Sequence, residues 1–279
     1  AKTSPHPRFL RHPDMKHLIL SFLLLFSFQQ ARCWGFFAHR KINRLAVFLL
    51  PPEMLAFYKL HIDFLMEHAV DPDKRRYAVK EEGPRHYIDL DHYGKAPFDT
   101  LPRGWDTAVA RFSEDSLMAH GIVPWWINRM HYRLTEAFKE KDTYRILKLS
   151  AEIGHYVADA HVPLHTTANH NGQLTGQEGI HGFWESRLPE LLADKEWDLL
   201  TGTADYLAHP LTYIWERTLE SAAAADSVLS MERLVNSRFP ADRKYAFEER
   251  NGKLVRSYST SYSIAYHRLL AEMPERRMR

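Results

Sequence analysis

Apolar residues recur every three or four positions along most of the chain, while the alternating pattern of strands is scarce. This spacing predicts a helix from about Ala38 to Leu50, stopped by Pro51-Pro52, and a second helix from Pro52 to His68. Further helices are predicted over Pro124–Glu140, Asp142–Val162, His181–Ala193, Leu211–Leu234 and Ser257–Glu272. The stretch from Val70 to Pro102 is rich in proline and charge and is predicted to be irregular. We expect an all-α fold with one multi-helix domain over residues 34–279.

The predicted helix that begins at Asp142 is apolar on two faces, which predicts that it is buried on both sides. One face carries Ile146, Leu149, Ile153, Val157 and Ala160, and the other carries Ala151, Ala158 and Val162. The second face also holds His155 and Asp159. Because an unpaired carboxylate is costly to bury, Asp159 is expected to have partners.

The segment from Met15 to Cys33 is typical of a secretory signal peptide: it has a short polar start, an apolar run and small residues before its end. The apolar run has about 11 residues, too few for a membrane span, which needs roughly 20. We expect no transmembrane segment, and we interpret residues 1–14 as an upstream extension of the reading frame. Cleavage ahead of Trp34 would deliver the mature protein to the periplasm or outside the cell.

Removal of this leader changes the charge and the cysteine content. The whole chain has a formal net charge of +2, and residues 1–33 carry five basic residues and one acidic residue, which leaves −2 for the mature chain. Such a protein cannot attract an anionic substrate by bulk charge, so local positive charge, such as bound metal, is needed. The single cysteine, Cys33, lies in the leader, so the mature protein is predicted to have no disulfide.

Histidines and carboxylates occur with metal-ligand spacing in one segment. His155 and Asp159 are four residues apart, so on a helix their side chains can grip one ion, although a His–Asp hydrogen bond in a core is an alternative. His181 and Glu185 repeat this spacing, and His165 lies between the pairs, beyond a helix-breaking proline. Nitrogen and carboxylate ligands without thiolates favour zinc, with manganese or iron also acceptable.

The sequence His-Tyr-Val-Ala-Asp-Ala-His-Val-Pro-Leu-His at 155–165, followed by Gly-Ile-His-Gly-Phe-Trp-Glu at 179–185, resembles the zinc-dependent phospholipase C superfamily. That superfamily also contains the single-strand-specific zinc nucleases. The resemblance implies an all-helical domain with a buried site for three zinc ions. It also implies that the mature chain begins with a tryptophan, here Trp34, whose amino group and carbonyl oxygen bind one ion. The motifs lie between Trp34 and about Leu191, and the C-terminal third carries no signature.

Carried over position by position, the resemblance implies three groups of metal ligands. They are Asp73, His86, His155 and Asp159 for the first zinc, Trp34, His39 and the shared Asp159 for the second, and His165, His181 and Glu185 for the third. Asp159 would thus bridge two ions, and Asp73 and Asp159 are the implied catalytic residues.

Three neighbouring features allow more than one interpretation. Asp71 lies two residues before Asp73, and Asp73 is preferred because Arg76 follows it at the family's spacing for a basic residue. His161 lies off the metal-binding face and is interpreted as a support for the site or a surface residue. The basic run of residues 74–76 could hold a phosphate or the ligand loop, or could simply face solvent.

The ligand types indicate hydrolysis of phosphoester bonds by water that the zinc ions activate, without a nucleophilic side chain. No Gly-x-Ser-x-Gly, Walker or His-Glu-x-x-His motif is present. Glu185, where nucleases have aspartate, and the short loop from His165 to His181 resemble the phospholipase branch, which acts on phospholipid head groups. The close spacing of Trp34 and His39 instead resembles the nuclease branch, which acts on single-stranded nucleic acid or nucleotides.

Other features do not separate these substrates. Asn169, Asn171 and Gly172 could touch substrate, but they are also ordinary turn residues. Residues Trp125, Trp126 and Trp184 could stack a base or line a lipid pocket, although aromatic residues at helical spacing are more often core. A non-catalytic metal-binding protein is a further hypothesis, and no obligate protein partner is evident.

Overall fold

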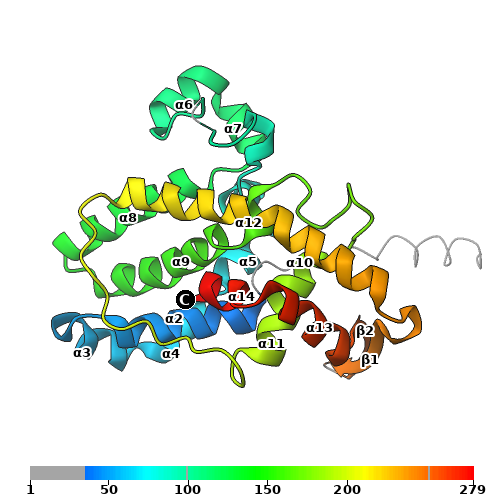
Figure 1. Ribbon diagram of the computed structural model, residues 1–279. Helices are drawn as coiled ribbons and strands as arrows, with labels where there is room; N and C mark the ends of the chain where they lie inside the picture. The colour runs from blue at the N-terminus through cyan, green and yellow to red at the C-terminus, as the bar shows by residue number, and fades with distance from the viewer. Residues whose placement is uncertain (1–34, 99, 251) are drawn as a thin grey trace, which may run out of the picture. The chain divides into compact units, whose positions relative to one another are not determined.

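Helices packed around one central helix, α9 (Thr143–Ala160), make up most of the computed structural model (Figure 1). The structure describes residues 35–98, 100–250 and 252–279. Helix α9 contacts α2, α4, α8 and α12, so its two apolar faces are both covered. The predicted signal peptide, the upstream extension and Trp34 lie outside the described residues.

Helices and short 3-10 turns follow one another through the first half of the chain. They are α2 (Phe36–Leu49), α3 (Pro52–Leu60), α4 (Ile62–His68), α5 (Asp71–Arg75), η1 (Lys80–His86), η2 (Leu90–Tyr93), α6 (Trp105–Phe112), α7 (Glu114–His120) and α8 (Val123–Lys139). The helix predicted over 52–68 is interrupted at His61, and this break lets α4 pack on α2 and α9. The prediction that 70–102 is irregular was wrong in part, because α5, η1 and η2 are short turns that a periodicity of several turns cannot reveal.

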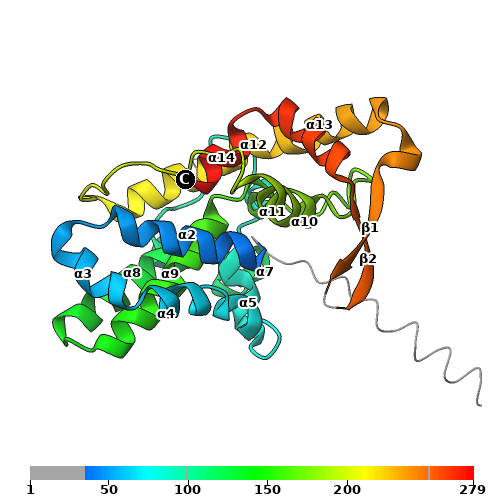
Figure 2. The same ribbon diagram turned by 90° about the horizontal axis from the view of Figure 1, so that it is seen from below.

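The second half of the chain adds a long helix and a β-hairpin (Figure 2). Its elements are η3 (Pro163–Thr166), α10 (Ile180–Gly182), the π-helical turn η4 (Phe183–Arg187), α11 (Leu188–Leu192), α12 (Pro210–Arg238), η5 (Ala241–Arg243), β1 (Tyr245–Arg250), β2 (Lys253–Tyr258), α13 (Thr260–Leu270) and α14 (Met273–Met278). The strands pair antiparallel, with Tyr245 opposite Tyr258. The helix predicted from Ser257 therefore begins late, because Ser257 and Tyr258 belong to this hairpin.

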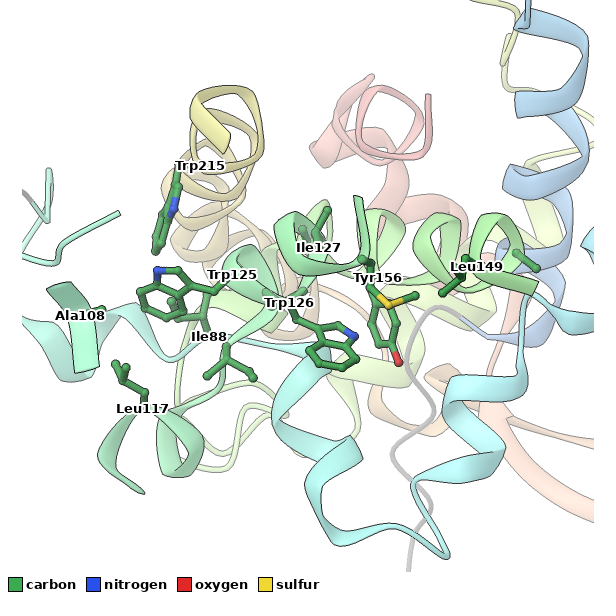
Figure 3. Packing of buried hydrophobic residues seen from close by; sticks show 14 of the residues in the cluster. Ile88, Ala108, Leu117, Trp125, Trp126, Ile127, Leu149, Tyr156 and Trp215 are labelled. Carbon is green, nitrogen blue, oxygen red and sulfur yellow. The ribbon is translucent and has the colours of Figure 1, made fainter. Parts of the chain in front are cut away.

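Two apolar clusters fill the interior of the described part. The first lies between α8 and α9, where Trp125 packs edge-on against Trp215 and Trp126 lies beside Tyr156 (Figure 3). In the second, Phe183 stacks on Tyr258 at 3.9 Å between ring centroids and so joins η4 to the hairpin. The prediction of an all-α fold is confirmed, and the described residues add one two-stranded β-hairpin to it. Among the described residues, no helix is both long and apolar enough to cross a membrane.

The packing of α2 on α9 brings functional side chains together. The side-chain amide of Asn43 donates hydrogen bonds to the carbonyl oxygens of Leu65 (3.1 Å) and Ala151 (3.0 Å), and so ties α2 to α4 and α9. Opposite it lies Gly154, where an added Cβ would overlap Asn43. Since His39 is one helical turn before Asn43 and His155 follows Gly154, this close approach stacks the two imidazole rings at 3.8 Å.

Candidate metal centre

Asp159 is the carboxylate around which four of the predicted ligands gather. Its two oxygens lie 2.8 Å from His86 Nδ1, 3.2 Å from His155 Nε2, 3.5 Å from His39 Nε2 and 3.8 Å from His165 Nδ1. Asp159, His39 and His155 are completely buried. Side chains from α2, η1, η3 and α9 thus meet at a single carboxylate, which fits the bridging position that the resemblance implies.

Asp73 adds a second carboxylate beside the same histidines. Its Oδ1 is 4.0 Å from both His86 Nδ1 and His155 Nε2. Asp71 instead lies on the surface, where it pairs with His68 (2.5 Å) and Lys74 (3.0 Å). The structure therefore brings the preferred aspartate, and not its neighbour, into the cluster.

A further group forms where η3 meets the segment of α10 and η4. His165 Nε2 and His181 Nε2 are 3.3 and 3.1 Å from Glu185 Oε2, and the two nitrogens are 3.2 Å from each other. The helix predicted over 181–193 is present, and it consists of α10, the π turn η4 that contains Glu185, and α11. Such π turns occur frequently at functional sites.

Hydrogen bonds from ring nitrogens to backbone carbonyl oxygens set the orientation of three of the imidazole rings. Nδ1 of His155 faces Ala69 O at 2.8 Å, Nδ1 of His165 faces His86 O at 2.7 Å, and Nδ1 of His181 faces His170 O at 3.0 Å. Because a carbonyl oxygen can only accept, each Nδ1 carries the proton in a neutral ring, and the lone pair is on Nε2. All three Nε2 atoms point into the cluster, because in metal sites a carbonyl that binds one ring nitrogen of a histidine orients the other nitrogen toward the ion.

The donor set needs a cation to be satisfied. Several buried atoms of the cluster have no hydrogen-bond partner: both ring nitrogens of His39, both carboxylate oxygens of Asp73 and Glu185, and Oδ1 of Asp159. Unpaired buried acceptors are expensive, and metal ligation is the usual way to compensate them. The described residues supply three groups with ligand atoms within 4.8 Å of one another: His39, His155 and Asp159; Asp73, His86 and His155; and His165, His181 and Glu185. The residues fit zinc, which takes nitrogen and oxygen ligands.

The pKa values of two of the histidines suit metal binding. Burial lowers the pKa of His39 well below its ordinary value, and nearby His155 adds to this effect. Burial also lowers the pKa of His181 to about 4. Both rings are thus neutral at pH 7, which is the form that ligates a metal. Burial raises the pKa of Glu185 to about 8, against the opposing effect of His165, so a cation beside it would stabilise the carboxylate form.

Sequence reasoning missed Glu82, a fully buried carboxylate behind the cluster. Its Oε1 lies 3.7 Å from His86 Nε2, the ring nitrogen that points away from Asp159. Arg75 donates to Glu82 Oε2 from Nε at 2.8 Å and to Glu152 Oε1 from Nη1 at 2.8 Å, while Tyr156 donates its hydroxyl to Glu82. The four-residue spacing of Glu82 and His86 was the available signal. Within the basic run 74–76, Arg75 therefore holds in place the carboxylate of Glu82, which lies beside the predicted ligand His86.

Residues with two interpretations take structural positions. The side chains of Asn169 and Asn171 bond within their own loop, to Leu174 N (2.8 Å) and to Gly179 N (3.0 Å) respectively. His161 donates from Nδ1 to Val157 O at 2.8 Å, and its backbone carbonyl accepts a hydrogen bond from Arg277 Nε at 2.9 Å. Trp125, Trp126 and Trp184 are 4%, 8% and 0% exposed, so all three belong to the core.

Comparison with known families agrees with this geometry. The family described as zinc dependent phospholipase C matches residues 38–249, and the chain belongs to this family. The match extends well beyond the motifs that end near Leu191. Comparisons with curated proteins and with solved structures gave no match. Family membership makes the chain a zinc-dependent hydrolase of the phosphodiesterase type.

Proposed function

We propose that this protein is a phospholipase C-like phosphodiesterase with three zinc ions, acting on the head group of a phospholipid. The observation that carries the proposal is the convergence of histidine nitrogens and carboxylates in one buried cluster, where several of these atoms have no hydrogen-bond partner. The proposed ligands are Asp73, His86, His155 and Asp159 for the first ion, Trp34, His39 and Asp159 for the second, and His165, His181 and Glu185 for the third. Asp73 and Asp159 are the proposed catalytic residues.

The chain's own residues would hold the reaction centre rigid. Zinc in such a cluster supplies Lewis-acid polarisation of phosphoryl oxygens and makes water a nucleophile near neutral pH. Asp159 faces both of the first two groups, so its charge balances positive charge at their boundary. The carbonyl oxygens of Ala69 and His86 keep the rings of His155 and His165 from rotating. Preorganised ligands of this kind avoid reorganisation during the reaction.

Trp34 is proposed as a ligand through its amino group and carbonyl oxygen. The support comes from Gly35, the next residue, which is buried and donates its backbone N–H to Glu185 O at 3.2 Å. An added Cβ on Gly35 would overlap Ser186, so this part of the chain lies tightly against η4. A free α-amine on Trp34 requires cleavage after Cys33, and secretion would therefore also complete the site.

The N-terminal role can be tested without a substitution. The secreted protein is compared with a form in which two alanines are inserted between the cleavage site and Trp34, and both are analysed for zinc and for hydrolysis. We expect the extended form to lose one zinc equivalent and most of its activity. Full zinc content and full activity with the extension would refute the role of Trp34, and N-terminal sequencing of the secreted protein tests cleavage itself.

The substrate is proposed from the family match and from Glu185 and the short loop before His181. A single-strand nuclease or 3′-nucleotidase is the alternative, favoured by the spacing of Trp34 and His39 alone. The deciding experiment offers phosphatidylcholine vesicles and single-stranded DNA to the zinc-loaded protein, with and without a chelator. We expect chelator-sensitive release of phosphocholine. Cleavage of DNA alone would select the nuclease, and cleavage of neither by a zinc-loaded protein would overturn both.

The proposed bridging role of Asp159 can be tested by substitution. Asp159→Asn removes the negative charge shared by the first two groups and should lower hydrolysis by at least about 100-fold, as loss of a supporting residue alone can reach that size. Wild-type turnover in this variant would exclude the bridging role. Zinc analysis of the same sample should show the loss of more than one equivalent.

A further inference from the structure

We propose that a cavity lined by α8 and α9 binds a phosphoryl group, at a place separate from the metal centre. The cavity has a volume of about 360 Å³, which lies within the size range of small-molecule sites. Five cationic side chains line it together with one carboxylate, that of Glu152. These cations are Arg75, Arg85, Arg133, Arg145 and Lys148. A phosphoryl group carries the charge and the acceptor oxygens that such a lining matches.

Two of the cations are held in place before any ligand arrives. Arg75 is fixed by Glu82 and Glu152, as described above. Arg85 donates from Nη1 to Glu82 Oε2 at 2.6 Å, and its guanidinium lies over the Trp126 ring at 4.0 Å from the centroid. Side chains that are already ordered lose little entropy on binding, so they favour recognition of an anion.

Two other cations keep their charge available. Lys148 and Arg133 form no ion pair within the described part of the chain, whereas Arg145 pairs with Glu140. Arg133 donates a weak hydrogen bond from Nη1 to the sulfur of Met130, at 3.7 Å. Lys148 lies on α9 and Arg133 on α8, so two cations without an ion pair face the cavity from different helices, while the carboxylates at the cavity are already shared with Arg75 and Arg85.

The cavity is separate from the candidate metal centre. None of the eight proposed metal ligands that the structure describes lines it, and the buried carboxylate of Glu82 stands between its arginines and His86. A ligand there would not occupy the reaction centre. Two sources supply the same chemistry: free inorganic phosphate, or the head group of an anionic phospholipid. The side chain of Tyr144, which also lines the cavity and is 64% exposed, is compatible with either source of the phosphoryl group.

The first experiment measures binding of inorganic phosphate to the zinc-loaded protein by calorimetry. Lys148→Glu is compared with Lys59→Glu, which makes the same charge change at an exposed site on α3. We expect a binding phase that weakens at least about tenfold in Lys148→Glu and is kept in Lys59→Glu, the size expected for a lost charged hydrogen bond. The inhibition constant of phosphate for hydrolysis, which reports the metal centre, should be equal in both variants.

The second experiment distinguishes the two sources. Flotation is measured with vesicles of pure phosphatidylcholine and with vesicles that also contain phosphatidylserine. If vesicle binding requires phosphatidylserine and is weakened by Lys148→Glu, the ligand is the lipid head group. If the protein binds inorganic phosphate but not these vesicles, the ligand is the free ion. The proposal is overturned if Lys148→Glu and Lys59→Glu both match the wild type in both assays, or if they lose binding equally.

A further variant of the cavity, Arg133→Ala, must also weaken binding. Unchanged thermal unfolding of Lys148→Glu and Arg133→Ala excludes misfolding as the cause.

Discussion

The Nε2 atoms of His165 and His181 face each other at 3.2 Å, and each ring has its Nδ1 against a backbone carbonyl oxygen. Two nitrogen lone pairs therefore point at one another, with Glu185 Oε2 beside both. Electron-rich atoms repel at such a distance unless a positive charge lies between them. The arrangement thus favours a bound cation more directly than the ligand spacing in the sequence does.

His181→Ala should remove one zinc equivalent and lower hydrolysis at least about 100-fold, because two ligands cannot hold the ion as three do. Metal content is measured by elemental analysis after gel filtration, and activity is measured on the same sample. His209→Ala changes an exposed histidine at the start of α12 and should keep both values. Equal zinc content in the two variants would show that His181 binds no metal.

Asp73→Asn and Asp71→Asn separate two aspartates that the sequence places two residues apart. The Asp73 oxygens are buried without a hydrogen-bond partner, so loss of their charge should release zinc and reduce hydrolysis by about 100-fold or more. Asp71 serves a surface contact with His68 and Lys74, so its variant should lose at most about 1 kcal/mol of stability. The same zinc and activity measurements decide between them, and a reversed result would exchange the two roles.

Glu82→Gln tests a residue that positions a ligand. Glu82 Oε1 lies 3.7 Å from His86 Nε2, beyond hydrogen-bond distance, so its negative charge can favour the proton on Nε2 and leave Nδ1 for the cluster. Loss of its charge should weaken zinc binding by about 10- to 100-fold, the usual effect of such carboxylates. Competition with a chelator of known affinity measures this change.

The control for that variant is Glu152→Gln, which also breaks a contact with Arg75, whereas of these two carboxylates it is Glu82 that lies beside His86 Nε2. If only the contacts of these carboxylates with Arg75 matter, the two variants should weaken zinc binding equally. A role of Glu82 in orienting His86 predicts a clearly larger loss for Glu82→Gln, and rescue by Glu82→Asp would point the same way.

Local spacing was enough to predict the parts of the site that lie within one helix. His155 and Asp159, and His181 and Glu185, are four residues apart, and Asp142 caps α9 by accepting a hydrogen bond from Arg145 N at 3.0 Å. Contacts between distant segments could not be predicted from local spacing. Glu82 became significant only because Arg75 and Tyr156 surround it. His39 was expected from the family resemblance alone, and it meets His155 only through helix packing.

The elements that were missed have similar causes. The short helices α6 and α7 contain too few turns for a periodic pattern to stand out. The hairpin of β1 and β2 carries many charged residues, so its apolar alternation is weak, although the Asn-Gly pair at 251–252 is a typical turn signal. The π turn at η4 depends on the packing of Phe183 against Tyr258, which no local spacing specifies.

Gly154→Ala tests whether the close approach of α2 and α9 builds the site. The new methyl group would overlap Asn43 and force the helices apart, which should cost about 1–3 kcal/mol of folding stability. It should also separate His39 from His155 and so reduce the affinity for zinc. Thermal unfolding of the zinc-free protein measures the first effect, and chelator competition measures the second.

Gly83→Ala provides the matched control, because an added Cβ at that glycine meets nothing within 4 Å. Its stability and zinc affinity should stay near those of the wild type. If Gly154→Ala lowered stability without changing zinc affinity, the approach of α2 to α9 would matter for folding alone. Loss of affinity beyond the loss of stability shows instead that the spacing of these helices sets the distance between His39 and the ligands on α9, which ties the glycine to the metal centre.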